Sequence, residues 1–408
     1  MASSRIVAAG VAGQRCLVDI RRANGREARE IFFSCQPSAG SAEPEAQAAA
    51  VYKTILETLG AEGSGYGAVV SEWVFLRNAR SDLRACRGAR RRVLKANGSP
   101  DHQPAITCVE QPPLDADAAL AVLVHAVIPK AHEERVVHGR TLSPATACEC
   151  PECSRSSGYL FPVGEEHRLQ TGNLYGYGAD AYRQTHSLFE LAEDLLQQAG
   201  MAFRDVTRTW IYLSEMDRDY ADLNRARREF FRSRRIDPSP ASTGIGAGLA
   251  APGHDISLAF SALQSGALPP RAVMTTPTLN EAPVYGADFS RGMRIEDSNK
   301  TGLLVSGTAS LDETGATVHV GDFDAQAHRM LVNVAALLEG QGATFGDVVS
   351  AITYVKDPAN ADRLREKFRE SGFEGFPNVL VEAVVCRPEL LCETEVLAVL
   401  PCFHPGQG

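Results

Sequence analysis

An internal repeat constrains the fold of this chain more than any other feature of its sequence. Five residues recur at one constant offset of 142 positions: Gln184, Gly200, Phe203, Asp205 and Tyr212 are matched by Gln326, Gly342, Phe345, Asp347 and Tyr354. Both sets share one context, an amphipathic helix that ends at the glycine and a strand that contains the tyrosine. A looser copy runs from Gln47 through Gly60 to a strand at 73–76. The chain is therefore predicted to contain three related units.

The periodicity of each unit predicts α+β structure. The helical segments carry apolar residues at i, i+3, i+4 and i+7, and the strands are rich in Val, Ile, Thr and aromatic residues. Stretches of Pro, Gly and polar residues separate the units. We expect a degenerate unit at 1–135, a linker with a cysteine cluster at 136–157, and further units at 158–268 and 269–404. Helices on one face of each mixed sheet would leave the other face to pack against neighbouring units.

Composition and charge argue against several classes of function. The 41 Lys and Arg residues are outnumbered by 50 Asp and Glu residues, so a nucleic-acid-binding surface is not expected. The basic run 84–95 is interpreted as a solvated helix face, with an anion site as the alternative. Nothing approaches the roughly 20 apolar residues of a membrane-spanning helix. Without a visible export signal, the ten cysteines are expected to be reduced thiols in the cytoplasm.

Three cysteines are close enough in sequence to suggest a metal site. Cys148, Cys150 and Cys153 have the spacing of a metal clip, but zinc would need a distant ligand such as His138 or His167. The simpler interpretation is a linker that happens to hold thiols. No Gly-rich phosphate loop follows a strand, and we expect no organic cofactor.

The last strand of the third unit carries the strongest candidate for catalysis. Glu393 and Glu395 alternate with Thr394 and Val396, which places both carboxyl groups on one face of a strand. Since the strand is otherwise apolar, at least one carboxyl is expected to be desolvated, with a raised pKa suited to a general acid. The corresponding strands of the other units, near 121–124 and 256–260, lack a Glu pair. The alternative is that Glu395 points to solvent or caps a neighbour.

The order of elements resembles that of the Rid/YjgF superfamily, whose motifs match at 306–310, 321–322 and 325–326. The resemblance implies a chorismate-mutase-like domain that forms trimers with active sites between subunits. Three copies in one chain would form an intrachain pseudo-trimer, either as a monomer or within a higher homo-oligomer. The last two units are more similar to the chorismatase branch, which they match at 208–212, 240–244, 289–291, 306–310 and 386–395. Two domains are expected in that branch, so the first copy departs from that pattern.

The chorismatase resemblance implies a biosynthetic hydrolase or lyase that acts on a small carboxylated enol ether. Glu393 would protonate the enol-ether methylene, water or an internal hydroxyl would capture the oxocarbenium ion, and pyruvate would be released. The resemblance and the residue pattern together suggest the following substrate-binding residues: Arg387 as a carboxylate clamp, Cys386 at a position linked to product choice, Tyr212 and Thr243 as donors from the second unit, Ser306 and Gly307 at the floor, and Glu395.

Alternatives remain at two residues and for the function. Arg387 could bridge to Glu389 on the surface, and Tyr212 could be an ordinary half-buried strand tyrosine. Generic Rid proteins hydrolyse imines and enamines and hold the substrate carboxylate with an Arg shortly after a Pro. The matching stretches at 104–108, 240–243 and 377–380 contain no Arg, which weighs against that activity. A ligand-binding protein without catalysis is the third possibility, but it would not need two carboxyl groups facing one cleft.

Overall fold

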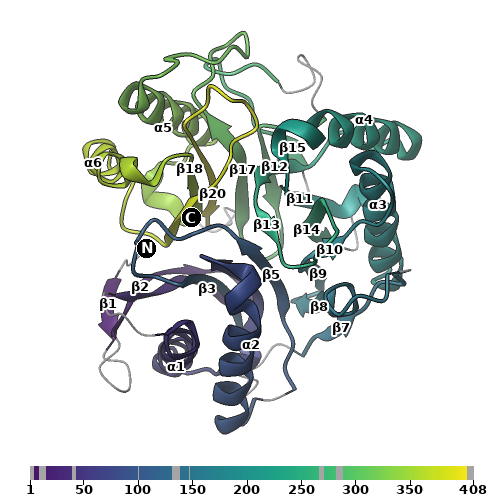
Figure 1. Cartoon of the computed structure of the whole chain (residues 1–408), viewed down its shortest axis with the longest axis vertical. Coiled ribbons are helices and arrows are strands. Elements are labelled where there is room, and N and C mark those ends of the chain that lie inside the picture. The colour runs from purple at the N-terminus through teal and green to yellow at the C-terminus, as the bar shows by residue number, and fades with distance from the viewer. Residues whose placement is uncertain are drawn as a thin grey trace, which may run out of the picture.

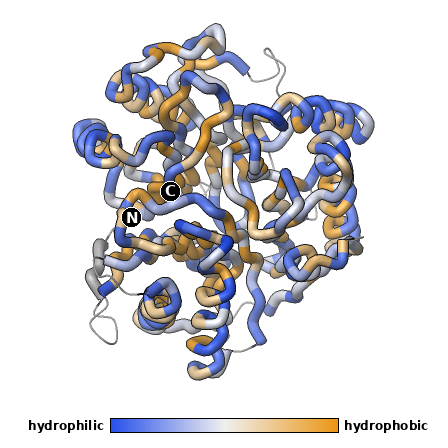
Figure 2. The backbone as a smooth tube through the Cα atoms, in the orientation of Figure 1, coloured by the Kyte–Doolittle hydropathy of each residue, from blue (hydrophilic) through white to orange (hydrophobic). Residues whose placement is uncertain are grey.

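The computed structural model describes residues 4–8, 15–38, 43–99, 101–130, 138–146, 148–265, 271–281 and 288–401. Three β-sheets surround a common centre, and each has two helices on its outer side (Figure 1). Apolar segments concentrate in the strands, whereas the peripheral helices alternate polar and apolar residues (Figure 2). The expected α+β architecture with three units is therefore confirmed.

The first sheet has the strand order β1-β2-β3-β6-β4-β5-β13. Its strands are β1 (Ser4–Ala8), β2 (Arg15–Asn24), β3 (Ala28–Ser38), β4 (Val69–Leu76), β5 (Ala105–Glu110), β6 (Leu120–Pro129) and β13 (Gly248–Leu249). The helices α1 (Pro44–Ala61) and α2 (Ala79–Ala96) pack on it, and the Asn78 side chain caps α2 by accepting a hydrogen bond from the Ser81 amide. Because β13 comes from the second unit, backbone pairing joins the first two units directly.

The second sheet has the order β12-β11-β14-β9-β8-β7, and β10 also pairs with β14. Its strands are β7 (Arg140–Leu142), β8 (Gly158–Val163), β9 (Glu166–Thr171), β10 (Leu174–Tyr175), β11 (Val206–Leu213), β12 (Ala241–Gly246) and β14 (Ile256–Gln264). Its helices are α3 (Ala181–Gln198) and α4 (Met216–Arg234). Strand β7 lies inside 136–157, which the sequence assigns to a linker, and it pairs with β8.

The third sheet has the order β15-β16-β17-β20-β18-β19. Its strands are β15 (Arg271–Val273), β16 (Gly292–Glu296), β17 (Thr301–Ala309), β18 (Val348–Val355), β19 (Asn378–Glu382) and β20 (Cys392–Leu400). The helices α5 (Phe323–Glu339) and α6 (Ala361–Ser371) cover its outer face. As in the other two units, the sheet and its helices enclose a large apolar cluster.

Strand register confirms that the three units are repeats. In each unit one parallel strand pair follows a helical crossover: β4 with β5, β11 with β12, and β18 with β19. The register also shifts at equivalent places, between Val69 and Ser71, Val206 and Arg208, and Val348 and Ser350.

The glycines that follow the first helix of each unit adopt a positive φ, which favours glycine at a turn. Gly200 and Gly342 have φ of 72° and 73°. The expectation that Gly60 ends the helix of the first unit is wrong, because α1 continues to Ala61 and the glycine with positive φ (73°) is Gly63.

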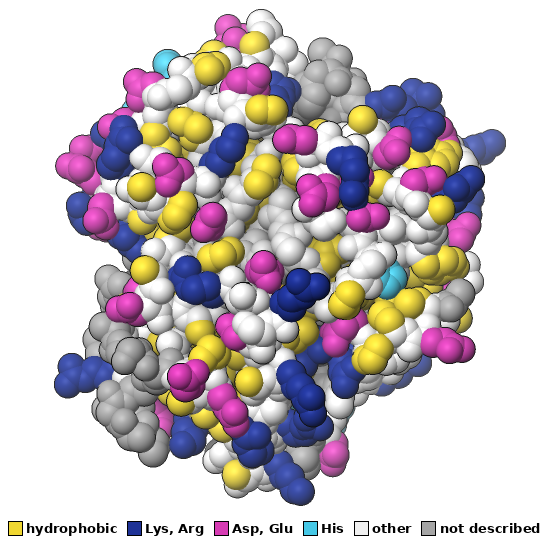
Figure 3. Space-filling model, in the orientation of Figure 1, with side chains coloured by type: hydrophobic (Ala, Val, Ile, Leu, Met, Phe, Trp, Pro, Cys, Tyr) yellow, Lys and Arg dark blue, Asp and Glu magenta, His cyan; other side chains and the backbone are white. Residues whose placement is uncertain are grey.

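The basic run at 84–95 is only partly a solvated face. Arg90 forms an ion pair of 3.2 Å with the fully buried Glu72, and Arg87 pairs with Glu152 at 2.6 Å. The space-filling view shows basic side chains gathered over α2, whereas acidic and basic groups are mixed over the rest of that face (Figure 3). Within the part of the chain that the structure describes, no helix is long and apolar enough to cross a membrane.

Buried charges from all three units meet at the centre of the molecule. Glu30 on β3 is fully buried and pairs with Arg168 of the second unit at 2.8 Å and with Lys300 of the third. His125 lies 2.9 Å from the same carboxylate. Burial by itself would raise the pKa of Glu30, but Lys300 and Arg168 outweigh burial and hold this pKa well below its usual range. The carboxylate therefore links the three units electrostatically.

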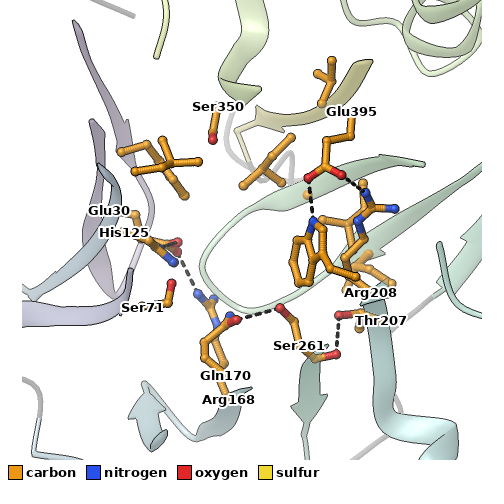
Figure 4. Close-up of a pocket in the computed structure, with 18 of the residues that line it drawn as sticks. Glu30, Ser71, His125, Arg168, Gln170, Thr207, Arg208, Ser261, Ser350 and Glu395 are labelled. Carbon is orange, nitrogen blue, oxygen red and sulfur yellow. Dashed lines mark hydrogen bonds and ion pairs between the residues drawn. The ribbon is translucent and has the colours of Figure 1, made fainter. Parts of the chain in front are cut away.

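A central cavity of about 160 Å³ lies among the three inner sheet faces. Glu30, His125 and Arg168 line one side of it, and Glu395 and Arg208 line another (Figure 4). Trp73 and Trp210 stand edge-to-face across the boundary of the first two units, with ring centroids 5.0 Å apart. Residues from all three units therefore line the central cavity, and the two tryptophans join the first unit to the second.

We predict that Glu30→Gln lowers the free energy of unfolding by about 3–5 kcal/mol, because it leaves the buried Lys300 and Arg168 without their carboxylate. Urea denaturation near neutral pH measures the loss. The difference from wild type should shrink as the pH falls through the lowered pKa of Glu30, where the wild-type carboxylate is also protonated. The matched control is Glu366→Gln on the exposed face of α6, and an equal loss in both variants would contradict the role of the central network.

Candidate active site

A second cavity, of about 330 Å³, lies between the second and third units. Helix α4 and β12 form one side, and β17, β20 and the segments around 289–291 and 386–390 form the other. Its lining residues are Tyr220, Leu223, Asn224, Arg227, Ser242, Gly244, Phe289, Arg291, Gly307, Ala309, Leu311, Cys386, Arg387, Leu390 and Glu393. Of the site residues predicted from the sequence, this cavity is lined by Glu393, Gly307, Cys386 and Arg387, whereas Glu395 lines the central cavity.

Strand β20 brings carboxyl groups to a position where the other units have none. Glu393 lies opposite Tyr354 on β18, and the equivalent pairs are Tyr212 with Ser257 and Phe75 with Ala121. The strand is central in its sheet, so both of its glutamates are buried, with 4% and 5% of their surface exposed. Of the three equivalent strands, β20 is therefore the one that carries a pair of carboxyl groups suited to acid–base chemistry.

Glu395 is held by donors from two units and lines the central cavity. Its carboxylate accepts hydrogen bonds from Nη2 of Arg208 at 3.0 Å and from Nε1 of Trp210 at 2.5 Å, both on β11. The Tyr354 hydroxyl donates a third bond at 3.3 Å. Glu395 therefore does not point to solvent, and the cavity next to Glu393 does not include it among its lining residues.

Glu393 has a different environment from its neighbour on the strand. Burial raises its pKa to about 8, and the negative charge of Glu395 adds to the increase against the opposing effect of Arg208 and Arg291. With this pKa the group is mostly protonated at neutral pH, and it faces the cavity. A buried carboxylic acid of this kind can donate a proton.

Gly307 and Thr243 determine where the Glu393 carboxyl lies. A β-carbon at position 307 would overlap Oε1 of Glu393 and lie 3.1 Å from Cγ2 of Thr243. The Thr243 hydroxyl accepts hydrogen bonds from the Gly307 amide at 3.0 Å and from Arg208 at 2.5 Å. Ser306, fully buried, joins the two units behind this floor by donating to the Ser290 carbonyl and accepting from the Ser242 amide. Gly307 lines the cavity, whereas the Thr243 and Ser306 side chains lie behind its surface.

Three guanidinium groups line the same cavity. Arg387 donates to the Gly315 carbonyl at 2.8 Å, whereas Arg227 and Arg291 are almost fully buried. The guanidinium carbons of Arg227 and Arg291 lie 5.7 and 5.6 Å from the centroid of the Phe289 ring. Fixed cations on several sides of a small cavity suit a ligand with more than one carboxylate.

The two other predicted residues have different outcomes. Cys386 lines the cavity, and burial raises the pKa of its thiol to about 12, so it is neutral there. Tyr212 is fully buried in the apolar cluster and is absent from the cavity lining. The expectation that Tyr212 donates into the cleft therefore fails, because its side chain points to the interior where Glu395 lies. Tyr220 on α4 lines the cavity instead.

Arg227 and Arg291 line the cavity but are not among the site residues predicted from the sequence. The segment 289–291 is part of the chorismatase resemblance, so Arg291 carried a usable signal. Arg227 carried none, since it is one of several arginines on α4 and only the packing of that helix directs it inward. Cys148, Cys150 and Cys153 lie elsewhere, beside His254.

Comparison with known proteins places the chain among homologues. The family described as endoribonuclease L-PSP matches residues 156–264 and 280–400. A 3-hydroxybenzoate synthase from Streptomyces hygroscopicus is 29% identical over 240 residues, which cover 52% of this chain and 68% of that protein. A RutC family protein from Pyrococcus abyssi is 35% identical over 98 residues, or 24% of this chain and 76% of its own.

The crystal structure of a chorismatase has a similar fold. It superposes with a TM-score of 0.59 at 19% identity and covers 83% of this chain and 94% of its own. This match extends beyond the last two units, so the expectation that the first unit departs from the chorismatase pattern is wrong at the level of the fold. The family match spans the second and third units and more than half of the chain, and the chain therefore belongs to the endoribonuclease L-PSP family, the Rid/YjgF superfamily.

Proposed function

We propose that the protein is a chorismatase-type enzyme, in which Glu393 acts as general acid on a small carboxylated enol ether. The observation that carries the proposal is a carboxyl with a pKa of about 8 facing a cavity lined by three arginines. The 3-hydroxybenzoate synthase and the chorismatase among the similar proteins support the same reaction class.

The proposed reaction begins with transfer of the Glu393 proton to the methylene carbon of the enol ether. The carbon that carries the ether oxygen becomes an oxocarbenium ion, and the Glu393 carboxylate that remains stabilises this cation. Water adds to the cation and gives up a proton to the Glu393 carboxylate, which restores the acid. The hemiketal C–O bond then breaks as the hemiketal hydroxyl proton passes to the leaving oxygen, so that pyruvate and an alcohol leave. An internal hydroxyl of the substrate could take the place of water, and the product would then differ.

The arginines would orient the substrate in this reaction. Arg227 reaches the cavity from α4 of the second unit, and Arg291 and Arg387 reach it from the third. The guanidinium groups of Arg227 and Arg291 both lie near the Phe289 ring. Guanidinium groups bind carboxylates through paired hydrogen bonds, so each substrate carboxylate would have a fixed partner. The pairing would hold the enol-ether methylene near Glu393, where orientation lowers the barrier.

The first test is to incubate the wild-type protein with chorismate. Release of pyruvate would establish the reaction class. We expect Glu393→Gln to lower kcat by roughly 10²–10⁴-fold, because an amide cannot supply the proton. A lactate dehydrogenase assay measures pyruvate, and Glu389→Gln, exposed and four residues away, is the control. If folded wild type releases no pyruvate, chorismate is excluded as substrate, and imine hydrolysis or ligand binding becomes the better hypothesis.

The pH dependence should identify the acid. The protonated form of Glu393 is required, so kcat/KM should be level below the pKa of about 8 and fall about tenfold per pH unit above it. Glu395→Gln removes the neighbouring negative charge and frees Arg208, and both changes lower the pKa of Glu393. The alkaline limb should therefore move to lower pH in that variant. A limb that stays in place would contradict the coupling of the two glutamates.

Gly307→Ala tests the position of the acid without removing it. The added methyl group would displace the Glu393 carboxyl, and we expect kcat to fall by roughly 10²-fold, with retained folding by circular dichroism. Gly302→Ala on the same strand is the matched control, since a β-carbon there comes no closer than 4.0 Å to the Ile295 carbonyl. Equal activity in both alanine variants would refute the proposed contact.

A further inference from the structure

Four potential metal ligands converge on one point outside the proposed active site. The sulfur atoms of Cys148, Cys150 and Cys153 lie 3.6, 3.8 and 3.4 Å from Nε2 of His254. All four ligand atoms lie within 4.8 Å of one another. The cysteines come from the connection between the first two units, whereas His254 comes from the turn before β14.

These separations match a tetrahedral zinc site. With Zn–S bonds of about 2.3 Å and a Zn–N bond of about 2.0–2.1 Å, tetrahedral angles place sulfur and nitrogen about 3.6 Å apart. The three measured sulfur–nitrogen distances scatter closely around that value. Thiolates and one imidazole are also a ligand set that favours zinc over hard cations.

The surroundings of the ligands fit metal binding. The carbonyl of Gly176 lies 2.6 Å from Nδ1 of His254, so Nδ1 carries the proton and Nε2 turns its lone pair to the sulfurs. Such a second hydrogen bond is usual for a zinc-bound histidine. The Cys153 amide donates to Cys150 Sγ at 3.3 Å, which would stabilise a thiolate.

The geometry distinguishes this arrangement from a set of incidental thiols. All three cysteines are free, and a disulfide between any two would leave the third sulfur facing the imidazole. His138 and His167, the ligands suggested by sequence, line a separate surface cavity. The residue that completes the set is His254, which lies about a hundred residues along the chain from the cysteines.

We propose that Cys148, Cys150, Cys153 and His254 bind one structural zinc ion. Four protein ligands fill a tetrahedral shell, so the ion would have no open position for catalysis. Its effect would be to tie the connection between the first two units to the second sheet. Glu152, next to the ligand Cys153, also pairs with Arg87 on α2 at 2.6 Å, so the same loop contacts the first unit.

Metal analysis of the purified full-length protein tests the proposal. Inductively coupled plasma mass spectrometry should find about one zinc ion per chain when the cells are grown with zinc, as a closed four-ligand site requires. Cys150→Ser should lower the zinc content at least about tenfold, since loss of one ligand weakens the site strongly. Cys86→Ser is the matched control, because Cys86 is a buried free cysteine on α2 that is not one of the four clustered ligands, and this variant should keep its zinc.

A second measurement uses wild type and does not depend on folding of the variant. Zinc is removed with a chelator under reducing conditions and replaced by Co²⁺, which should give the absorption bands of tetrahedral cobalt with thiolate ligands. Chelation should also lower Tm, and added zinc should restore it. Iron in place of zinc, a disulfide seen as a mass lower by about two hydrogens, or wild type that takes up neither zinc nor cobalt would overturn the proposal.

Discussion

The ion pair between Glu395 and Arg208 underlies both the assembly of the site and its chemistry. It joins β20 of the third unit to β11 of the second at 3.0 Å in a buried environment, where breaking such a pair costs about 3–5 kcal/mol. Arg208 also donates to Thr243, which in turn orients Gly307. Burial is the main cause of the raised pKa of Glu393, and the charge of Glu395, two residues away, adds to it. This one contact therefore links the boundary between the units to the floor of the cavity and to the environment of the acid.

A single chain allows its three unit boundaries to differ, which an assembly of identical subunits does not. The register position of Glu393 is occupied by Ser257 in the second unit and by Ala121 in the first. The second unit supplies Arg227 from α4 and the third supplies the acid, so one boundary holds both. All three units contribute to the buried charges at the centre, with Glu30 in the first, Arg168 in the second and Lys300 in the third.

Sequence patterns predicted local structure well and long-range partners poorly. Period-two alternation placed Glu393 and Glu395 on one strand face, which the structure has. It could not tell which carboxyl would meet a cation, because Arg208 is 187 residues away from Glu395. The same reason explains why His254 was missed beside the cysteines. The wrong prediction for Tyr212 has a different cause. Its strand was predicted correctly, but the alternation of side chains does not show which neighbouring element each face of the strand packs against.

The proposed acid works against the charges that would bind its substrate. Cations lower the pKa of a nearby carboxyl, and Arg291 has this effect on Glu393, although burial and Glu395 outweigh it. A substrate that brings carboxylates to the arginines would neutralise them and also displace water from the cavity. Both changes favour the protonated form of Glu393. Binding and protonation would therefore reinforce each other, so the cavity would hold its acid most firmly protonated when an anionic substrate occupies it.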